Sequence, residues 1–317
     1  MKISWIITLE VILKLNKMLN WIYFVLISQG IWSITSLIDK IVISKGYIKN
    51  PLVYIVLNGL ANILLIFILP FVGFKALSFI DISIVMISGI LFSASVALYY
   101  KAVQDEEISR IAMLFQLAPI FVLVLSFLFL GETLTKNHFI GFLFLLSTGV
   151  IISYKRINGV FKLSKSFYLM LISAVFAAIS FVAAKHIFNV TSFWNAFLWL
   201  RISGFTALLV LFVPTLRSQF IETFRIMKNK ARVLLGFKMI IDFSAFIFAG
   251  YAIINAPAIA LISALANSLL PAFVFILTSF TSLYFPKLIK EEIDKKAILT
   301  KILAIILIII GIIFVNR

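Results

Sequence analysis

The polarity pattern of the chain consists of long apolar stretches separated by short polar segments. A helix needs roughly 20 residues to cross the hydrocarbon core of a bilayer. Ten stretches approach that length, and each ends at charged residues, proline or asparagine. They lack the alternating polar and apolar positions of an outer-membrane barrel. The pattern therefore predicts an all-α integral membrane protein with ten transmembrane helices. The predicted spans are 21–43, 52–73, 81–100, 111–130, 137–154, 167–188, 193–213, 233–254, 257–285 and 298–315.

Two of the segments outside these spans carry expectations of their own. Residues 1–20 are too short and too charged to cross a membrane, and they lack the small-residue cleavage site of a signal peptide. We therefore expect them to form an amphipathic helix on the membrane surface. Residues 214–232 are rich in basic side chains and are expected to form a solvated loop.

The second half of the chain repeats the first half in a degraded form. The stretch LISQGIWSITSLIDKIVI from Leu26 aligns with LISAVFAAISFVAAKHIF from Leu171, and further matches follow in the same order, including Pro119 with Pro271. Each copy holds five spans, and an odd number forces the second copy to enter the membrane upside down. This predicts two inverted five-helix repeats, an architecture typical of secondary transporters. The predicted divisions are 1–20 for the N-terminal segment, 21–156 for the first repeat and 157–317 for the second.

The composition indicates lipid as the main solvent. Hydrophobic residues make up 63% of the chain and charged residues 13%, with a mean hydropathy of +1.17. Soluble domains have about half apolar and about a quarter charged residues. The absence of cysteine removes disulfides, thiolate metal sites and a cysteine nucleophile. The two histidines, His138 and His186, are far apart in the sequence, so we expect no metal and no cofactor.

The net charge of +16 is explained by basic loops at the membrane surface rather than by nucleic-acid binding. Seventeen Lys and Arg residues fall in the loops after the odd-numbered predicted spans, against six on the opposite side. The positive-inside rule then places those loops in the cytoplasm and both termini outside. We expect a multi-pass protein of the cell (inner) membrane, with the lipid bilayer as a partner and no nucleic acid.

A hairpin at the end of the first repeat resembles a known family. It reads SRIAMLFQLAPIFVLVLSFLFLGETLTKNHFIGFLFLLSTGVIIS, with a proline in mid-helix, a Gly-Glu-x-Leu-Thr turn and a Gly-containing last helix. These features resemble the EamA domain of the drug/metabolite transporter superfamily. The stretches ALISALANSLLPAFVFILTSF and KILAIILIIIGIIFV are similar to a second, degraded copy. The resemblance implies ten helices in two inverted halves and the export or exchange of small metabolites. Small four-helix members use a Glu in their first helix for proton coupling, and the first span here has only Asp39, so the resemblance supplies no coupling residue.

Polar side chains gather on one face of the first span. Gln29, Trp32, Ser33 and Ser36 follow one another at i, i+3, i+4 and i+7. Polar groups in lipid face a bundle interior. This face is therefore expected to line a substrate cavity or, for the serines, to allow close helix packing. Ser180 in the sixth span falls near the equivalent position and carries the same two interpretations.

An amide side chain precedes a mid-helix proline in each repeat. Gln116 lies three residues before Pro119, and Asn267 lies four residues before Pro271. Because proline frees a backbone carbonyl one turn earlier, the two amides either line a cavity or satisfy the kinks. In the turn before the fifth span, Thr135 can cap the helix. Glu132 there is interpreted as a turn and helix-start residue rather than a catalytic acid.

Arg201 and Asp242 are charged residues deep inside predicted spans. At about 1.5 Å per residue, their depths differ by roughly 4–5 Å, so we predict a direct or water-mediated pair. Such a pair is either structural or part of a substrate or proton site. Lys238, one turn from Asp242, competes for it. Lys40, Lys185 and Lys238 are expected to extend to the membrane interface.

These patterns predict a secondary transporter, not an enzyme, that moves small organic metabolites or drugs by alternating access between the two repeats. Coupling to protons or another ion is left open. The alternatives are an intramembrane enzyme, which would need clustered catalytic groups, and a non-transporting membrane scaffold. Tyr100 and Tyr251, at matching positions of the two copies, join the candidates. The candidate substrate-binding residues are Gln29, Trp32, Ser33, Ser36, Tyr100, Gln116, Ser180, Arg201, Asp242, Tyr251 and Asn267.

Overall fold

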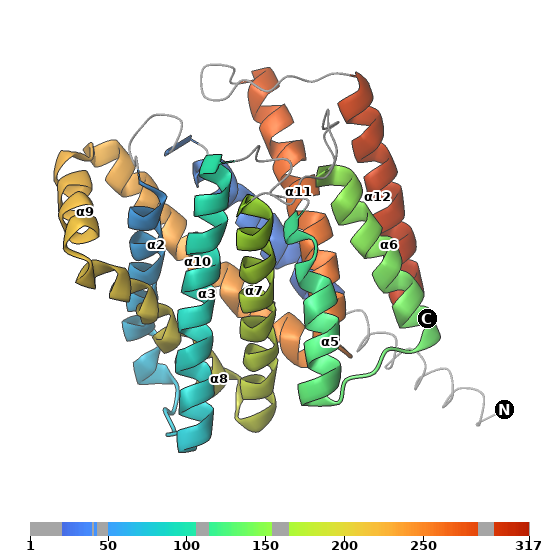
Figure 1. Ribbon diagram of the computed structural model, residues 1–317, viewed down its shortest axis with the longest axis horizontal. Helices are drawn as coiled ribbons and strands as arrows, with labels where there is room; N and C mark the ends of the chain where they lie inside the picture. Colours follow the sequence, from blue (N-terminus) through green and yellow to red (C-terminus); the bar gives the residue numbers. More distant parts are fainter. Residues whose placement is uncertain are drawn as a thin grey trace.

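The computed structural model describes residues 21–39, 41–42, 50–105, 114–153, 165–284 and 295–316, and in these residues the regular structure is entirely helical. The predicted amphipathic segment 1–20 and Lys40 lie outside the described residues. Figure 1 shows the helices side by side in a bundle. Their bounds are Trp21–Asp39, α2 (Pro51–Leu60), η1 (Ala61–Phe67), η2 (Leu69–Phe71), α3 (Phe79–Asp105), α5 (Ala118–Leu130), α6 (Lys136–Ser153), α7 (Lys165–Val190), α8 (Phe193–Ser203), η3 (Gly204–Phe212), α9 (Pro214–Ile226), α10 (Asn229–Asn255), α11 (Ile259–Tyr284) and α12 (Lys295–Val315).

Six of the described helical segments are long and apolar enough to cross a membrane. They are Trp21–Asp39, Phe79–Tyr99, Lys165–Val190, Phe193–Phe212, Asn229–Asn255 and Ile259–Tyr284. Four further apolar stretches of 10–17 residues lie within the remaining helices: Ile55–Phe71, Ala118–Leu130, Lys136–Ile151 and Ile302–Val315. The all-helical membrane fold is therefore confirmed. The count of ten spans stays a prediction, because only six of the described helical segments combine the length and the apolarity of a full crossing.

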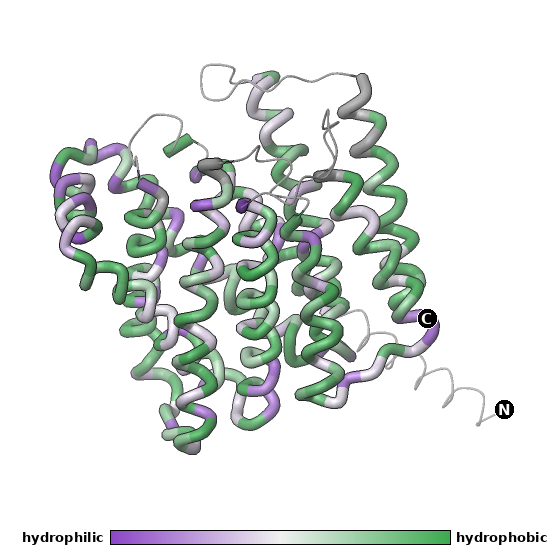
Figure 2. Tube along the Cα trace, in the orientation of Figure 1, coloured by the Kyte–Doolittle hydropathy of each residue, from purple (hydrophilic) through white to green (hydrophobic). Residues whose placement is uncertain are grey.

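The outer surface of the bundle is apolar. Several large apolar side chains on this surface are highly exposed, among them Phe71 (87% exposed), Phe212 (81%) and Phe129 (74%). Figure 2 shows hydrophobic residues along the lengths of the helices, with hydrophilic ones gathered near many of their ends. A water-facing surface does not take this form, because exposed apolar patches of such extent mark contact with a membrane or a partner.

The basic segment 214–232 departs from its prediction as a loop, because its first part is the helix α9. Pro214 stands at the first helical position, where its missing N–H costs nothing. Arg232 from α10 closes the other end, since its guanidinium donates to the carbonyls of Phe224 (2.8 Å) and Arg225 (3.3 Å). Two of the five basic side chains, Arg217 and Arg225, therefore belong to an ordered helix at the edge of the bundle, and Lys230 and Arg232 belong to the start of α10.

Helices α3 and α7 pack against each other in antiparallel orientation. Near their middle, the Ser95 hydroxyl donates to the Ser173 carbonyl at 2.8 Å, and the Ser173 hydroxyl donates back to the Ser95 carbonyl at 2.8 Å. At one end of the pair, Asp81 Oδ1 lies 2.9 Å from His186 Nε2. These contacts join the third helical segment of the first predicted repeat to the first helix of the second.

The helix Trp21–Asp39 and α10 form the reciprocal antiparallel pair. Phe24 stacks on Tyr251 with ring centroids 5.4 Å apart, and Asp39 at the other end lies 3.5 Å from Lys238. The first helix of each predicted repeat thus packs on the third helical segment of the other.

Equivalent helices of the two predicted repeats also meet each other. The start of α6 crosses the end of α12 closely, because a Cβ on Gly311 would lie 3.3 Å from the Gly141 carbonyl oxygen and 2.8 Å from Leu145. Segments α2–η1 and α8–η3 cross at Gly59, where an added Cβ would lie 2.8 Å from Ala207. Both segments change from α-helix to 3₁₀-helix near this crossing, after Leu60 and Ser203 respectively.

Candidate functional site

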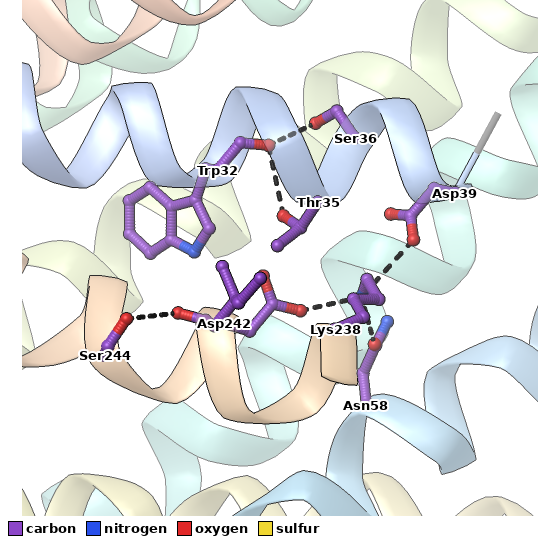
Figure 3. A network of polar contacts seen from close by, with 9 residues as sticks. Trp32, Thr35, Ser36, Asp39, Asn58, Lys238, Asp242 and Ser244 are labelled. Carbon is purple, nitrogen blue, oxygen red and sulfur yellow. Dashed lines mark hydrogen bonds and ion pairs between the residues drawn. The ribbon is translucent and has the colours of Figure 1, made fainter. Parts of the chain in front are cut away.

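Lys238 of α10 is the centre of a charged network between three helices (Figure 3). Its Nζ lies 2.7 Å from Asp242 Oδ2, one turn along α10, and 3.5 Å from Asp39 Oδ1 at the end of the helix Trp21–Asp39. The same Nζ donates a 2.8 Å hydrogen bond to Asn58 Oδ1 of α2. One ammonium group therefore joins two carboxylates and an amide that come from separate parts of the chain.

The network is largely shielded from solvent. The Lys238 side chain is 5% exposed, and those of Asp242 and Asp39 are 15% and 29% exposed. A charge in such a place is tolerated only when it is paired and hydrogen-bonded. With all three groups ionised, the two carboxylates outnumber the ammonium by one negative charge.

Arg201 of α8 makes no direct contact with Asp242, so the direct form of the predicted pair is wrong, and the water-mediated form stays a prediction. Its guanidinium carbon lies 3.7 Å from the ring centroid of Phe246 and 5.9 Å from that of Phe197, and its Nε is buried without a hydrogen-bond partner. The Asp242 carboxylate still acts on Arg201 electrostatically. The correction has a simple cause: Lys238 lies one turn away on the same helix and occupies Asp242, while Phe246 offers Arg201 an aromatic face.

Aromatic side chains extend from Arg201 along α10. Trp32 meets Phe246 edge-on with centroids 5.2 Å apart. Further along the helix, Tyr251 stacks on Phe193 at 4.0 Å and an interplanar angle of 17°. Two predicted residues, Trp32 and Tyr251, therefore lie in an aromatic wall between the helix Trp21–Asp39, α8 and α10.

The polar face of the first span is satisfied mostly within its own helix. Ser33 donates to the Gly30 carbonyl at 2.6 Å, and Ser36 donates to the Trp32 carbonyl at 2.8 Å. Gln29 is buried at 4% exposure. The intrahelical bonds favour the packing interpretation for both serines, because a hydroxyl that is bonded to its own backbone offers less to a substrate.

Ser180 packs between helices instead of joining the charged network. Its hydroxyl lies 2.9 Å from the Ser88 carbonyl of α3 and 2.9 Å from the Phe176 carbonyl of its own helix. Ser180 therefore belongs to the α3–α7 contact described above, together with Ser95 and Ser173.

The two amides near the prolines also lie apart from the network. Gln116 is buried (6% exposed) and its amide fills the space that a side chain on Gly149 of α6 would occupy. Asn267 is partly buried in α11, which continues through Pro271. Tyr100 lies in α3, and its side chain is outside the described part of the structure.

A second polar cluster lies at the other end of α10. Lys185 of α7 is buried (6% exposed), and its Nζ donates to the carbonyls of Ile253 (2.6 Å) and Ala256 (3.2 Å). Glu132 Oε2 accepts a 2.9 Å hydrogen bond from the backbone N–H of Ile259, the first residue of α11. The Lys185 ammonium group therefore lies at the C-terminal end of α10, and the Glu132 carboxylate lies at the N-terminal end of α11. The dipoles of the two helices favour a cation and an anion at these positions.

Several predictions for these polar residues need correction. Lys185 and Lys238 are buried and bonded, so neither extends to the interface. Glu132 lies in the connection before α6, as predicted, but its carboxylate caps α11. The predicted cap by Thr135 is confirmed, because its hydroxyl accepts from the His138 N–H at 3.2 Å.

Sequence reasoning missed the roles of Asn58 and Asp39 in the network. A signal was present for Asn58: it is one of two asparagines, with Asn62, spaced by one helical turn in an otherwise apolar run. Asp39 sits at the end of a span, where a charge is ordinary. Within the described residues, no three His, Asp or Glu side chains gather into a group that could hold a metal ion.

Comparison with known proteins agrees with this architecture. Residues 19–154 match the EamA-like transporter family. No curated protein sequence matches the chain. One solved structure, described as "Crystal structure of protein", has 16% sequence identity and a TM-score of 0.63, and the match covers 94% of this chain and 95% of that chain. At this identity the likeness shows a shared fold. Residues 19–154 therefore match the EamA-like transporter family, which belongs to the drug/metabolite transporter superfamily, and this match together with the apolar helices supports a transmembrane transporter of that type.

Proposed function

We propose that the protein is a secondary transporter that moves small organic metabolites or drugs by alternating access between two inverted repeats, 21–156 and 157–317. The observation that carries this proposal is the bond between Lys238 and Asp39, at 3.5 Å. It joins a buried charge of the second repeat to a carboxylate of the first. Any movement of one repeat against the other must break or rearrange this pair.

The packing of the helices supports the inverted arrangement. The helix Trp21–Asp39 lies antiparallel on α10 as α3 lies antiparallel on α7, which a two-fold axis in the membrane plane would produce. The helix breaks after Leu60 and after Ser203 fall in corresponding segments of the two repeats. Paired interruptions of this kind are a marker of transporter binding sites.

The two polar clusters suggest how access could alternate. Lys238 and Ile253 are fifteen residues apart on α10, which corresponds to about 22 Å along the helix axis. At the Lys238 end of α10, opening of the substrate site to that side of the membrane would separate Asp39 from Lys238. At the other end, it would separate Glu132 from the start of α11. In this proposal the two contacts are not broken at the same time.

Substrate would bind beside Arg201, between the two clusters. The guanidinium carbon lies 3.7 Å from the Phe246 ring centroid, and the buried Nε has no hydrogen-bond partner among the described residues, so the guanidinium is able to receive an acidic group. Trp32 and Phe246 would contact an apolar body. In the substrate-free protein the positive charge of Arg201 offsets the excess negative charge of Asp39 and Asp242 over Lys238. Once an acidic substrate occupies Arg201, that excess would be balanced by a proton or another cation, which couples transport to an ion gradient.

The test is uptake into vesicles reconstituted with the purified protein. A panel of radiolabelled amino acids, sugars and nucleosides would be offered under an imposed proton gradient, with protein-free vesicles as the control. We expect at least one compound to accumulate only in the presence of the protein. Arg201→Met should abolish binding of an acidic substrate while the protein stays folded. Absence of uptake for every compound, under gradients of either direction, would favour a non-transporting scaffold.

A further inference from the structure

A groove runs between η3 and α9 on the outer surface of the bundle, in a region that the transport site does not use. It has a volume of about 520 Å³, within the range of ligand-binding pockets. Phe205, Leu209 and Phe212 line it from η3, and Arg217, Phe220 and Ile221 line it from α9. All but one of these side chains are apolar, and the exception is a guanidinium.

The groove is a fixed feature because the middle of α9 and its C-terminal end are tied to neighbouring helices. Gln219 accepts a 2.5 Å hydrogen bond from Asn50, the residue that caps α2. At the far end, Arg232 donates to two carbonyls of α9 and lies over the ring of Phe224, 5.3 Å from its centroid. Phe220 also packs against the apolar cluster around Met227.

The lining residues face the surroundings of the bundle. Phe212 is 81% exposed, Ile221 54% and Leu209 48%. In a membrane protein these side chains meet hydrocarbon, and an apolar groove open to hydrocarbon takes up an acyl chain. Water in it would leave the apolar walls without dispersion contacts.

The charge of the groove selects the headgroup. The Arg217 side chain is exposed, and its guanidinium makes no hydrogen bond or ion pair with another described residue. Residues 214–232 carry five basic side chains and one acidic one, a net charge of +4. A guanidinium forms paired hydrogen bonds with phosphate oxygens, and clusters of basic residues beside a membrane attract anionic lipids.

We propose that the groove between η3 and α9 binds one anionic phospholipid, with an acyl chain against Phe212 and Ile221 and the headgroup phosphate on Arg217. Such a lipid would hold α9 against η3, on the segment that connects α8 to α10. It would therefore support the helix that carries Lys238 and Asp242 from outside the transport site.

Native mass spectrometry of the detergent-solubilised protein tests this proposal with two lipids of identical chains, palmitoyl-oleoyl phosphatidylglycerol and palmitoyl-oleoyl phosphatidylcholine. We expect one phosphatidylglycerol to be retained roughly fivefold better, the ratio for about 1 kcal/mol per basic residue. Arg217→Gln should remove this preference. Arg225→Gln, on the same helix and outside the groove lining, should keep it. Glycerophosphoglycerol without acyl chains should not compete.

Leu209→Trp provides a second variant that keeps Arg217 and fills the groove, so it should reduce retention of both lipids. It also decides the matter if Arg217→Gln does not fold. The proposal is overturned if Arg217→Gln keeps the preference, if Arg225→Gln loses it equally, or if Leu209→Trp retains phosphatidylglycerol as the unmodified protein does. The proposal is also overturned if Leu209→Trp displaces a second copy of the chain, rather than a lipid, from the groove.

Discussion

Lys238 of α10 lies 3.5 Å from Asp39 at the end of the helix Trp21–Asp39, so a buried cation joins segments almost 200 residues apart in sequence. The same ammonium group is bonded to Asp242 at 2.7 Å. Two carboxylates therefore depend on one lysine, and removing the lysine has a larger effect than removing either acid.

Lys238→Met should lower the thermal stability of the protein markedly. The substitution leaves Asp39 and Asp242 facing each other without a counter-charge, and breaking a buried pair costs roughly 3–5 kcal/mol. We expect about 3 kcal/mol, the lower end, because the Asp39 side chain is 29% exposed. Thermal unfolding in detergent measures the effect. Lys230→Met, on an exposed side chain of the same helix, is the control, and equal melting temperatures for the two variants would refute the role of Lys238.

Gly89→Ala should destabilise the contact between α3 and α8. A Cβ at Gly89 would lie 2.8 Å from Ser203 Cβ and would also meet the Ser203 backbone, and overpacking of this kind costs about 1–3 kcal/mol. Gly236→Ala in α10 is the matched control, because no atom lies within 4 Å of its added Cβ. That control should gain up to about 1 kcal/mol from helix propensity. A stabilising Gly89→Ala would contradict the close approach of these two helices.

Glu132→Ala should destabilise the start of α11 in the second half of the chain. The change removes the acceptor for the Ile259 N–H, and loss of a helix cap costs about 1 kcal/mol. Glu132→Gln retains an acceptor oxygen and should recover part of the loss. Glu222→Ala on exposed α9 is the comparison, and the three unfolding temperatures are measured together. An effect of Glu132→Ala no larger than that of Glu222→Ala would remove the capping role.

A reporter fused after Arg317 should lie outside the cytoplasm. The sequence places seventeen basic residues on one side of the membrane and six on the side of the termini. A phosphatase that is active only outside the cytoplasm should therefore be active in this fusion, and a cytoplasmic fluorescent protein should be dark. The opposite pair of signals would show that the predicted orientation is wrong, while the helical fold would be unaffected.

Much of the fold was available from the sequence because lipid imposes a simple rule on long segments. Apolar runs bounded by charges predicted helices, and the described helices overlap every predicted span. The changes to 3₁₀-helix after Leu60 and Ser203 were missed. They arise where α2–η1 and α8–η3 cross at close range, and that contact is tertiary.

The candidate site was predicted only in part, because periodicity places a residue on a face but does not choose its partner. Asp242 and Trp32 were correctly expected inside the bundle. The partner of Asp242 was decided by competition between Lys238, one turn away, and Arg201, on another helix. Lys185 was expected at the membrane interface, but it is buried because its ammonium group donates hydrogen bonds to carbonyls at the end of α10. Such partners become visible only when the helices are brought together.

The measurement that tests the central proposal most directly is transport by Asp242→Asn, with thermal stability determined on the same preparation. Asp242 is paired with Lys238, so a coupling role requires its charge, whereas folding still has the Lys238–Asp39 pair. We expect the variant to be folded, with a melting temperature close to that of the unmodified protein. It should exchange substrate across the vesicle membrane but fail to accumulate it against a gradient. Accumulation equal to that of the unmodified protein would contradict the proposal that this charged network couples the two repeats.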